Sequence, residues 1–198
     1  MIRFILCLLV LPVLLSGCAA LSSPDTPRKE KPLSERRDVA EANISREAGD
    51  LFARAHVLWK GGDICSDPAM AVHLLDQAIA LEPDYADAHM YRGLAYSEMG
   101  HDEETFSDLT QAILLDPRPH RYAYRALGLI RMGDLEGARK DLNRSVDMDE
   151  SQHRAWNFRA VVNMMEDNDD DACSDFKQGC KNGDCTGYET AKKEGVCR

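Results

Sequence analysis

Residues 83–117 read PDYADAHMYRGLAYSEMGHDEETFSDLTQAILLDP, and this stretch decides the fold because its features recur along the chain. An Arg followed by a small residue occurs at steps of 38, 33 and 34 residues, and the last three copies have an aromatic residue before the Arg. The four pairs are Arg54-Ala55, Arg92-Gly93, Arg125-Ala126 and Arg159-Ala160. Repetition at such a period predicts stacked copies of one supersecondary unit.

Other positions keep the same register and predict where helices end. A turn residue lies seven positions after each small residue, at Gly62, Gly100, Gly133 and Asp167. Gly accommodates the left-handed backbone that ends many helices, and Pro83 and Pro117, 34 residues apart, would stop a second helix. The spacing therefore predicts helix pairs at residues 40–60 and 68–82, 85–99 and 102–115, 119–132 and 135–148, and 152–166 and 169–180.

These repeats resemble the tetratricopeptide repeat (TPR) over about residues 45–181. The resemblance implies an all-α fold, a right-handed solenoid of about four helical hairpins, which we assign to residues 40–181. It also implies that the first helix of each hairpin lines a concave groove for extended or helical peptides. The residues placed in this groove are Asp87, Met90, Leu94 and Ser97, then Ala123, Leu127 and Ile130, then Asn157, Val161, Met164 and Met165.

The predicted groove is mostly apolar, which suits an apolar or amphipathic segment of a partner protein. The Lys and Asn pattern with which some TPR proteins clamp a peptide's C-terminal carboxylate is absent from it. A second interpretation stays open, in which the chain's own tail or N-terminal helix covers these side chains. The chain is then either an interaction adaptor or assembly factor, or a structural spacer that self-associates into an oligomer.

A recurring charge pair accompanies the last three repeats. Each has an Asp 16 residues after its Arg, whereas the first repeat has Leu74 at the aligned position. We predict structural ion pairs that join helices, in preference to a ladder of ligand-binding charges. The pairs are Arg92 with Asp108, Arg125 with Asp141, and Arg159 with Asp175.

The N-terminus indicates an exported, lipid-anchored protein. Arg3 precedes an apolar run at residues 4–15 that is too short to span a bilayer and is typical of a signal peptide. The following residues, Leu15-Ser16-Gly17-Cys18, resemble the bacterial lipobox, which implies cleavage after residue 17 and acylation, palmitate included, of Cys18. Residues 18–39 would then be a flexible tether, and Ala19 favours the periplasmic face of the outer membrane. An ordinary secretory signal with a chance cysteine is the alternative.

Four of the seven cysteines lie in the last 26 residues, at Cys173, Cys180, Cys185 and Cys197. A disulfide staple or a zinc site would explain them, but the absence of a CxxC motif and an exported context favour disulfides. Of the three pairings, two antiparallel helices favour the nested one, Cys180 with Cys185 and Cys173 with Cys197. Residues 182–198, with a short helix at 186–194, would cap the solenoid, and Cys65 is left over. A redox or metal module built on these cysteines is a third class of function.

Charge and motif content exclude other classes. The formal net charge of -10 leaves no basic surface for nucleic acid. The chain lacks the HExxH, GxSxG, GxxxxGK[ST] and GxGxxG motifs, so we expect no enzyme activity, no small-molecule substrate and no cofactor. The acidic run at residues 166–171 lacks the Gly and Glu of a calcium loop, because Ala172 and Gln178 stand there.

Overall fold

The computed structural model describes residues 44–59 and 64–197, which belong to one compact unit spanning residues 33–198. The predicted signal peptide, Cys18 and the tether at 18–39 lie outside the described residues. The described part is helical and contains no strand. Its helices are α2 (Arg46–His56), α3 (Pro68–Leu81), α4 (Ala86–Met99), α5 (Asp102–Leu115), α6 (Pro119–Met132), α7 (Leu135–Met148), α8 (His153–Met165), α9 (Asp169–Lys181) and α10 (Thr186–Lys193).

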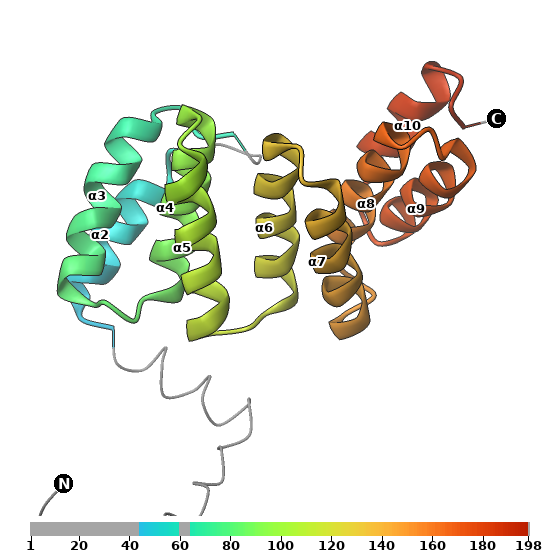
Figure 1. Ribbon diagram of the computed structural model, residues 1–198. Helices are drawn as coiled ribbons and strands as arrows, with labels where there is room; N and C mark the ends of the chain where they lie inside the picture. Colours follow the sequence, from blue (N-terminus) through green and yellow to red (C-terminus); the bar gives the residue numbers. More distant parts are fainter. Residues whose placement is uncertain (1–43, 60–63, 198) are drawn as a thin grey trace, which may run out of the picture. The chain divides into compact units, whose positions relative to one another are not determined.

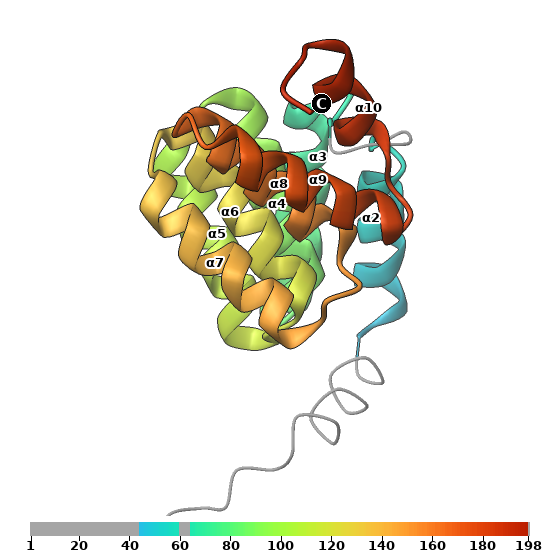
Figure 2. The ribbon, with the colours of Figure 1, turned by 90° about the vertical axis from the view of Figure 1, so that its right-hand side faces the viewer.

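The helices pair into hairpins that stack in chain order. α2 packs on α3, α4 on α5, α6 on α7 and α8 on α9, and each hairpin also contacts the next (Figures 1 and 2). The short α10 packs on α9 at the C-terminal end of the stack. The expected all-α solenoid of four hairpins with a C-terminal capping helix is therefore confirmed.

The helix bounds follow from local capping. Ser45 accepts a hydrogen bond from the Ala48 backbone N–H at 3.3 Å and begins α2. The expected helix at 40–60 is therefore wrong for residues 44, 45 and 57–59, which lie outside it. Gly100 (φ 74°) and Gly133 (φ 81°) adopt the left-handed conformation and end α4 and α6. The remaining expected helices differ from the observed ones by at most one residue at either end.

Small residues allow the two helices of a hairpin to approach closely. Ala55, Ala126 and Ala160, each in the first helix of its hairpin, are fully buried. At the aligned Gly93, an added Cβ would lie 2.9 Å from Leu109 Cγ on α5, closer than side chains normally approach. The repeated small position therefore reflects a steric requirement of packing.

The recurring Arg–Asp pairs fasten the two helices of each hairpin. In all three, the Arg Nε and Nη2 donate to the two carboxylate oxygens of the Asp at 2.7–2.8 Å. These bonds raise the pKa of Arg125 and Arg159. Burial alone would raise the pKa of Asp108, but hydrogen bonds from Arg92 and His89 lower it below its usual value.

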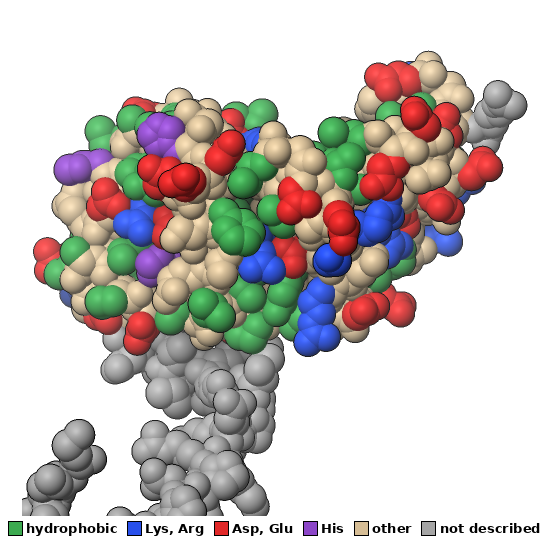
Figure 3. All heavy atoms as spheres, in the orientation of Figure 1, with side chains coloured by type: hydrophobic (Ala, Val, Ile, Leu, Met, Phe, Trp, Pro, Cys, Tyr) green, Lys and Arg blue, Asp and Glu red, His purple; other side chains and the backbone are tan. Residues whose placement is uncertain are grey.

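The same arginines also reach the preceding hairpin. Their Nη1 atoms donate to the second helix of that hairpin: Arg92 to Asp76 at 2.6 Å, Arg125 to Thr110 at 3.3 Å, and Arg159 to Asn143 at 2.9 Å. Each arginine therefore links three helices, which the sequence alone did not predict. On the face shown in Figure 3, basic side chains lie among acidic ones and form no continuous basic surface.

We expect Asp141→Asn to destabilise the fold because Arg125, only 19% exposed at its side chain, would lose its charged acceptor. The free energy of unfolding should fall by about 2–4 kcal/mol, near the range for breaking a buried pair. The matched control is Glu136→Gln on the same helix, which breaks the exposed Glu136–Lys140 pair and should leave the stability nearly unchanged. Urea unfolding followed by circular dichroism measures both, and equal effects would contradict this role.

Candidate functional site

The candidate site is the face formed by the first helices of the hairpins, α2, α4, α6 and α8. These helices present the side chains that the sequence placed in a groove. Among the described helices of this face, α4 contacts α6 and α6 contacts α8. The site is therefore a continuous surface, but its predicted residues differ widely in exposure.

Three of the predicted groove residues are in the core, so this part of the prediction is wrong. Met90 and Leu94 are each 3% exposed and lie in the cluster that joins the first two hairpins, and Leu127 from α6 packs against it. Ala123 is fully buried in the next cluster. Neighbouring first helices pack closely enough that these side chains fill the space between them.

The accessible apolar surface lies farther along the array. Val161 is 36% exposed and Met165 is 52% exposed, both on α8. The other predicted groove residues with partial exposure are Asp87, Ser97, Leu127, Ile130 and Met164. The surface open to a partner is therefore centred on α6 and α8.

Polar contacts hold α4 against α6 at both ends of the two helices. Arg121, 2% exposed at its side chain, pairs with Asp87 on α4 and with Asp116. Asp87, which was predicted to line the groove, is therefore part of an ion pair within the chain. At the other end of these helices, Arg131 Nη1 donates to Ser97 Oγ at 2.9 Å and lies 2.9 Å from Glu98 Oε1. These contacts fix the relative position of the two helices.

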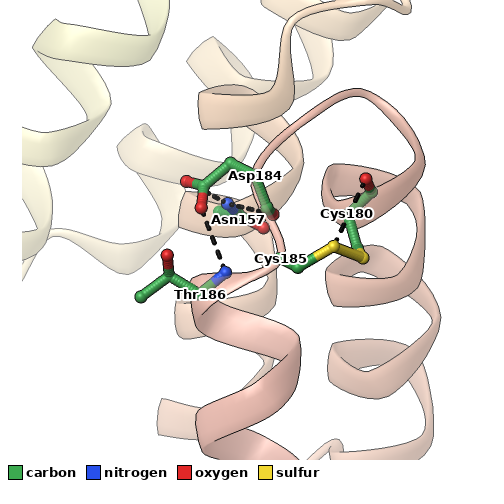
Figure 4. The surroundings of a disulfide bond; sticks show 5 residues. All are labelled: Asn157, Cys180, Asp184, Cys185 and Thr186. Atoms are coloured by element: carbon green, nitrogen blue, oxygen red, sulfur yellow. Dashed lines mark hydrogen bonds between the residues drawn. A yellow bond between two sulfur atoms is a disulfide. The ribbon is translucent and has the colours of Figure 1, made fainter.

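Asn157 anchors the C-terminal cap instead of lining the groove. Its Nδ2 donates to Asp184 Oδ2 at 2.9 Å, and Asp184 Oδ1 accepts from the Thr186 backbone N–H at 3.1 Å at the start of α10 (Figure 4). The bond to the Thr186 N–H lowers the pKa of Asp184. The groove prediction is wrong for this residue because the cap occupies the place where a further hairpin would continue the surface.

Two glycines that were not singled out from the sequence permit the close packing of the cap, Gly179 against Asn157 and Gly187 against Phe176. A Cβ at Gly179 would lie 2.1 Å from Asn157 Oδ1, and one at Gly187 would lie 2.5 Å from Phe176 Cε1. Both glycines lie inside segments that the sequence predicted to be helical. A glycine inside a helix is unfavourable unless close packing requires it, so their positions were a signal of close packing.

The structure brings the four tail cysteines together in two disulfides. Cys173 pairs with Cys197, and Cys180 pairs with Cys185 (Figure 4), which is the nested arrangement. The first bridge ties the chain's end to α9 and the second closes the turn that carries Asp184. Cys65 is the free cysteine of the described residues; it is buried in the first core cluster, and burial raises the pKa of its thiol.

Comparison with known proteins settles the family. A model of the tetratricopeptide repeat matches residues 52–98 and 124–183, more than half of the chain. The chain belongs to the tetratricopeptide repeat family. No curated protein matches the sequence.

Several solved TPR structures share the fold at low sequence identity. The TPR protein TTC0263 of Thermus thermophilus is similar with a TM-score of 0.65 and 15% identity, covering 83% of this chain and 88% of that one. MamA has a TM-score of 0.57 and 18% identity, with 82% and 89% covered. YrrB, described as a TPR protein with an unusual peptide-binding site, has a TM-score of 0.53 and 17% identity, with 83% and 86% covered.

One similar structure was determined with a peptide. The first TPR of Spaghetti (RPAP3) bound to the HSP90 peptide SRMEEVD has a TM-score of 0.55 and 18% identity, covering 62% of this chain and 95% of that one. At such identities the likeness concerns the fold alone. Within the described TPR array, no helix is long and apolar enough to span a bilayer, and no group of side chains is arranged to hold a metal ion.

We expect Gly179→Ala to destabilise the cap of the TPR array because the new methyl group would overlap Asn157. The cost should be about 1–3 kcal/mol of unfolding free energy, and it should shrink in an Asn157→Ala background, where the obstructing amide is gone. Gly49→Ala on α2 is the matched control, since a Cβ there meets nothing within 4 Å and should be neutral or stabilising. Additive effects of Gly179→Ala and Asn157→Ala would contradict the proposed contact.

His120, in the first turn of α6 beside Arg121, should make the TPR array sensitive to acid. Burial, followed by the Arg121 charge, lowers the pKa of His120 from 6.5 to about 4. The unfolded chain therefore binds the His120 proton more tightly than the folded chain does. The contribution of neutral His120 to stability is complete above about pH 6.5 and is lost as the pH falls toward 4. His120→Gln should therefore lose less stability than the native chain between pH 7 and pH 4.5 in urea unfolding.

The control is His73→Gln, which removes an exposed imidazole from α3 and so shows the effect of replacing a histidine that is not buried. A titration of the His120 ring by NMR gives its pKa directly. If His120→Gln and the native chain lost equal stability over this pH range, the assigned role of His120 would be wrong.

Proposed function

We propose that this TPR chain is an adaptor or assembly factor of the bacterial cell envelope, tethered to the membrane through a lipid on Cys18. It would bind a segment of a partner protein on the accessible apolar surface of α6 and α8. The exposure of Val161 and Met165 beside partly exposed Leu127 and Met164 carries this proposal. The lipobox-like Leu15-Ser16-Gly17-Cys18 supports the anchor.

The chemistry of this surface suits an apolar or amphipathic segment. Methionine side chains adapt to different partners at little conformational cost, and Leu127, Ile130 and Val161 add apolar area around them. The peptide bound to the first TPR of RPAP3 and the peptide-binding site named for YrrB support the use of a TPR array to bind peptide segments. The accessible apolar side chains of α6 and α8 offer area for binding, so recognition is the function that they support.

A self-associating spacer is the second candidate, and one observation favours it. Met90, Leu94 and Ala123 are covered by the chain itself, as a self-filled groove would require. Val161 and Met165 on α8 nevertheless stay exposed. The two candidates therefore make different predictions for substitutions on α8.

We expect Val161→Glu and Met165→Glu to abolish partner capture while leaving the fold intact, because both side chains are exposed. The bait is the chain without residues 1–17, folded under oxidising conditions and incubated with solubilised envelope extract, with mass spectrometry as the readout. Leu114→Glu, at a 73% exposed position on α5, is the control and should retain the partner. In intact cells, Cys18→Ser should move the protein out of the membrane fraction.

Capture that survives both α8 substitutions would exclude this surface as the binding site. Dimers that both α8 substitutions dissociate, seen by sedimentation in the absence of extract, would favour the self-associating spacer. A Cys18→Ser chain that stays in the membrane fraction would exclude the lipid anchor without affecting the adaptor assignment.

A further inference from the structure

One edge of the array exposes apolar side chains in every hairpin, and we call it the turn edge. It is the edge at which the first helix of a hairpin turns into the second. In the first hairpin it carries Val57, Ile64 and Met70, which are 63%, 70% and 47% exposed. In the next three it carries Met99, Met132 and Met165, which are 39%, 39% and 52% exposed.

The three methionines lie in a row along the turn edge, because each is the last residue of its helix, α4, α6 or α8. Met99 and Met132 directly precede the turn residues Gly100 and Gly133, whereas Met165 lies two residues before Asp167. Arg131 contacts Ser97 and Glu98, which places Met132 and Met99 at neighbouring helix ends. Packed helices lie about 8–10 Å apart, and an α-helix presents the same face every seven residues, about 10.5 Å. A partner helix could therefore place one apolar side chain on Met99 and another on Met132.

Carboxylates flank this row. The first turns of α5, α7 and α9 lie next to the turns and are acidic, and Figure 3 shows acidic side chains over α5 and α9. These residues are Asp102, Glu103 and Glu104, then Asp134 and Glu136, then Glu166, Asp167, Asp169, Asp170 and Asp171.

Three basic residues of the same edge are each paired with a carboxylate. Arg131 pairs with Glu98, Arg139 with Glu166, and Lys140 with Glu136. The carboxylates of this edge outnumber its basic residues, so its net charge is negative. Acidic residues in a first turn also stabilise their own helix, but this does not account for the exposed methionines beside them.

We infer that the turn edge binds a cationic amphipathic helix of a partner protein. Apolar residues of that helix lie on Met99, Met132 and Met165, and its Lys and Arg side chains face the carboxylates beside them. Methionine-rich surfaces with acidic borders accept such helices because the thioether side chains adapt and the charges are complementary. Met99 and Met132 lie outside the groove, whereas Met165 belongs to both surfaces, so the test of this inference substitutes Met99 and Met132 alone.

The test uses a defined probe, an 18-residue labelled peptide of Leu and Lys with its leucines on one helical face. It is titrated with the chain lacking residues 1–17, and binding is followed by fluorescence anisotropy at low and high salt. Two further peptides serve as controls: one with the same residues reordered so that no apolar face forms, and one with Glu in place of Lys.

The paired substitution Met99→Gln with Met132→Gln should weaken binding of the Lys peptide by about tenfold or more. The matched control is Leu81→Gln with Leu114→Gln, which removes two exposed side chains, also 33 residues apart, at the C-terminal ends of α3 and α5. This pair should change the affinity by less than about twofold. High salt should weaken binding, and both control peptides should bind poorly. Circular dichroism verifies that each variant is folded.

Several results would overturn the inference. The first is equal loss of affinity in the two paired variants, and the second is equal binding of the Glu peptide. Binding that Val161→Glu abolishes and the methionine pair leaves intact would assign the peptide to the groove. Failure of the chain to bind the Lys peptide would also overturn it.

Discussion

The array depends on an arginine that binds two other helices from the first helix of its hairpin. A single TPR hairpin cannot bury both of its faces, so contacts between hairpins decide whether the stack persists. Arg92 gives two donors to Asp108 in its own hairpin and a third to Asp76 in the preceding one. Arg125 and Arg159 repeat the arrangement. This geometry needs the planar, many-donor guanidinium group, and lysine could not reproduce it.

The C-terminal end requires a different solution because no fifth hairpin follows. There the chain uses α10, two disulfides and the contact between Asn157 and Asp184. Gly179 and Gly187 permit the close packing that this cap needs. The cap takes a position that the groove would otherwise have used. The accessible groove is therefore shorter than four repeats would suggest, since its beginning is filled by Met90 and Leu94 and its end is closed by Asn157.

The helices could be predicted from the sequence because their signals are local. Arg-plus-small pairs, turn glycines and closing prolines lie at fixed spacing, and the observed helices follow them closely. The Arg–Asp spacing of 16 residues likewise placed both partners within one hairpin. The groove was harder to predict, because exposure there depends on how closely neighbouring first helices approach. The sequence register gives the direction of Met90 and Ala123 but not the distance to the next helix, and it does not reveal that Asn157 turns toward the cap.

Charge and apolar exposure together restrict what these surfaces can contact. The chain carries a formal net charge of -10, and its exposed methionines lie beside carboxylates. Anionic lipid or nucleic acid would be repelled by such a border, whereas a cationic or neutral protein segment would not. If Cys18 is lipidated as we propose, this charge opposes adsorption of these surfaces on an anionic membrane. The groove and the turn edge would then stay available to protein partners even though the array is held close to a membrane.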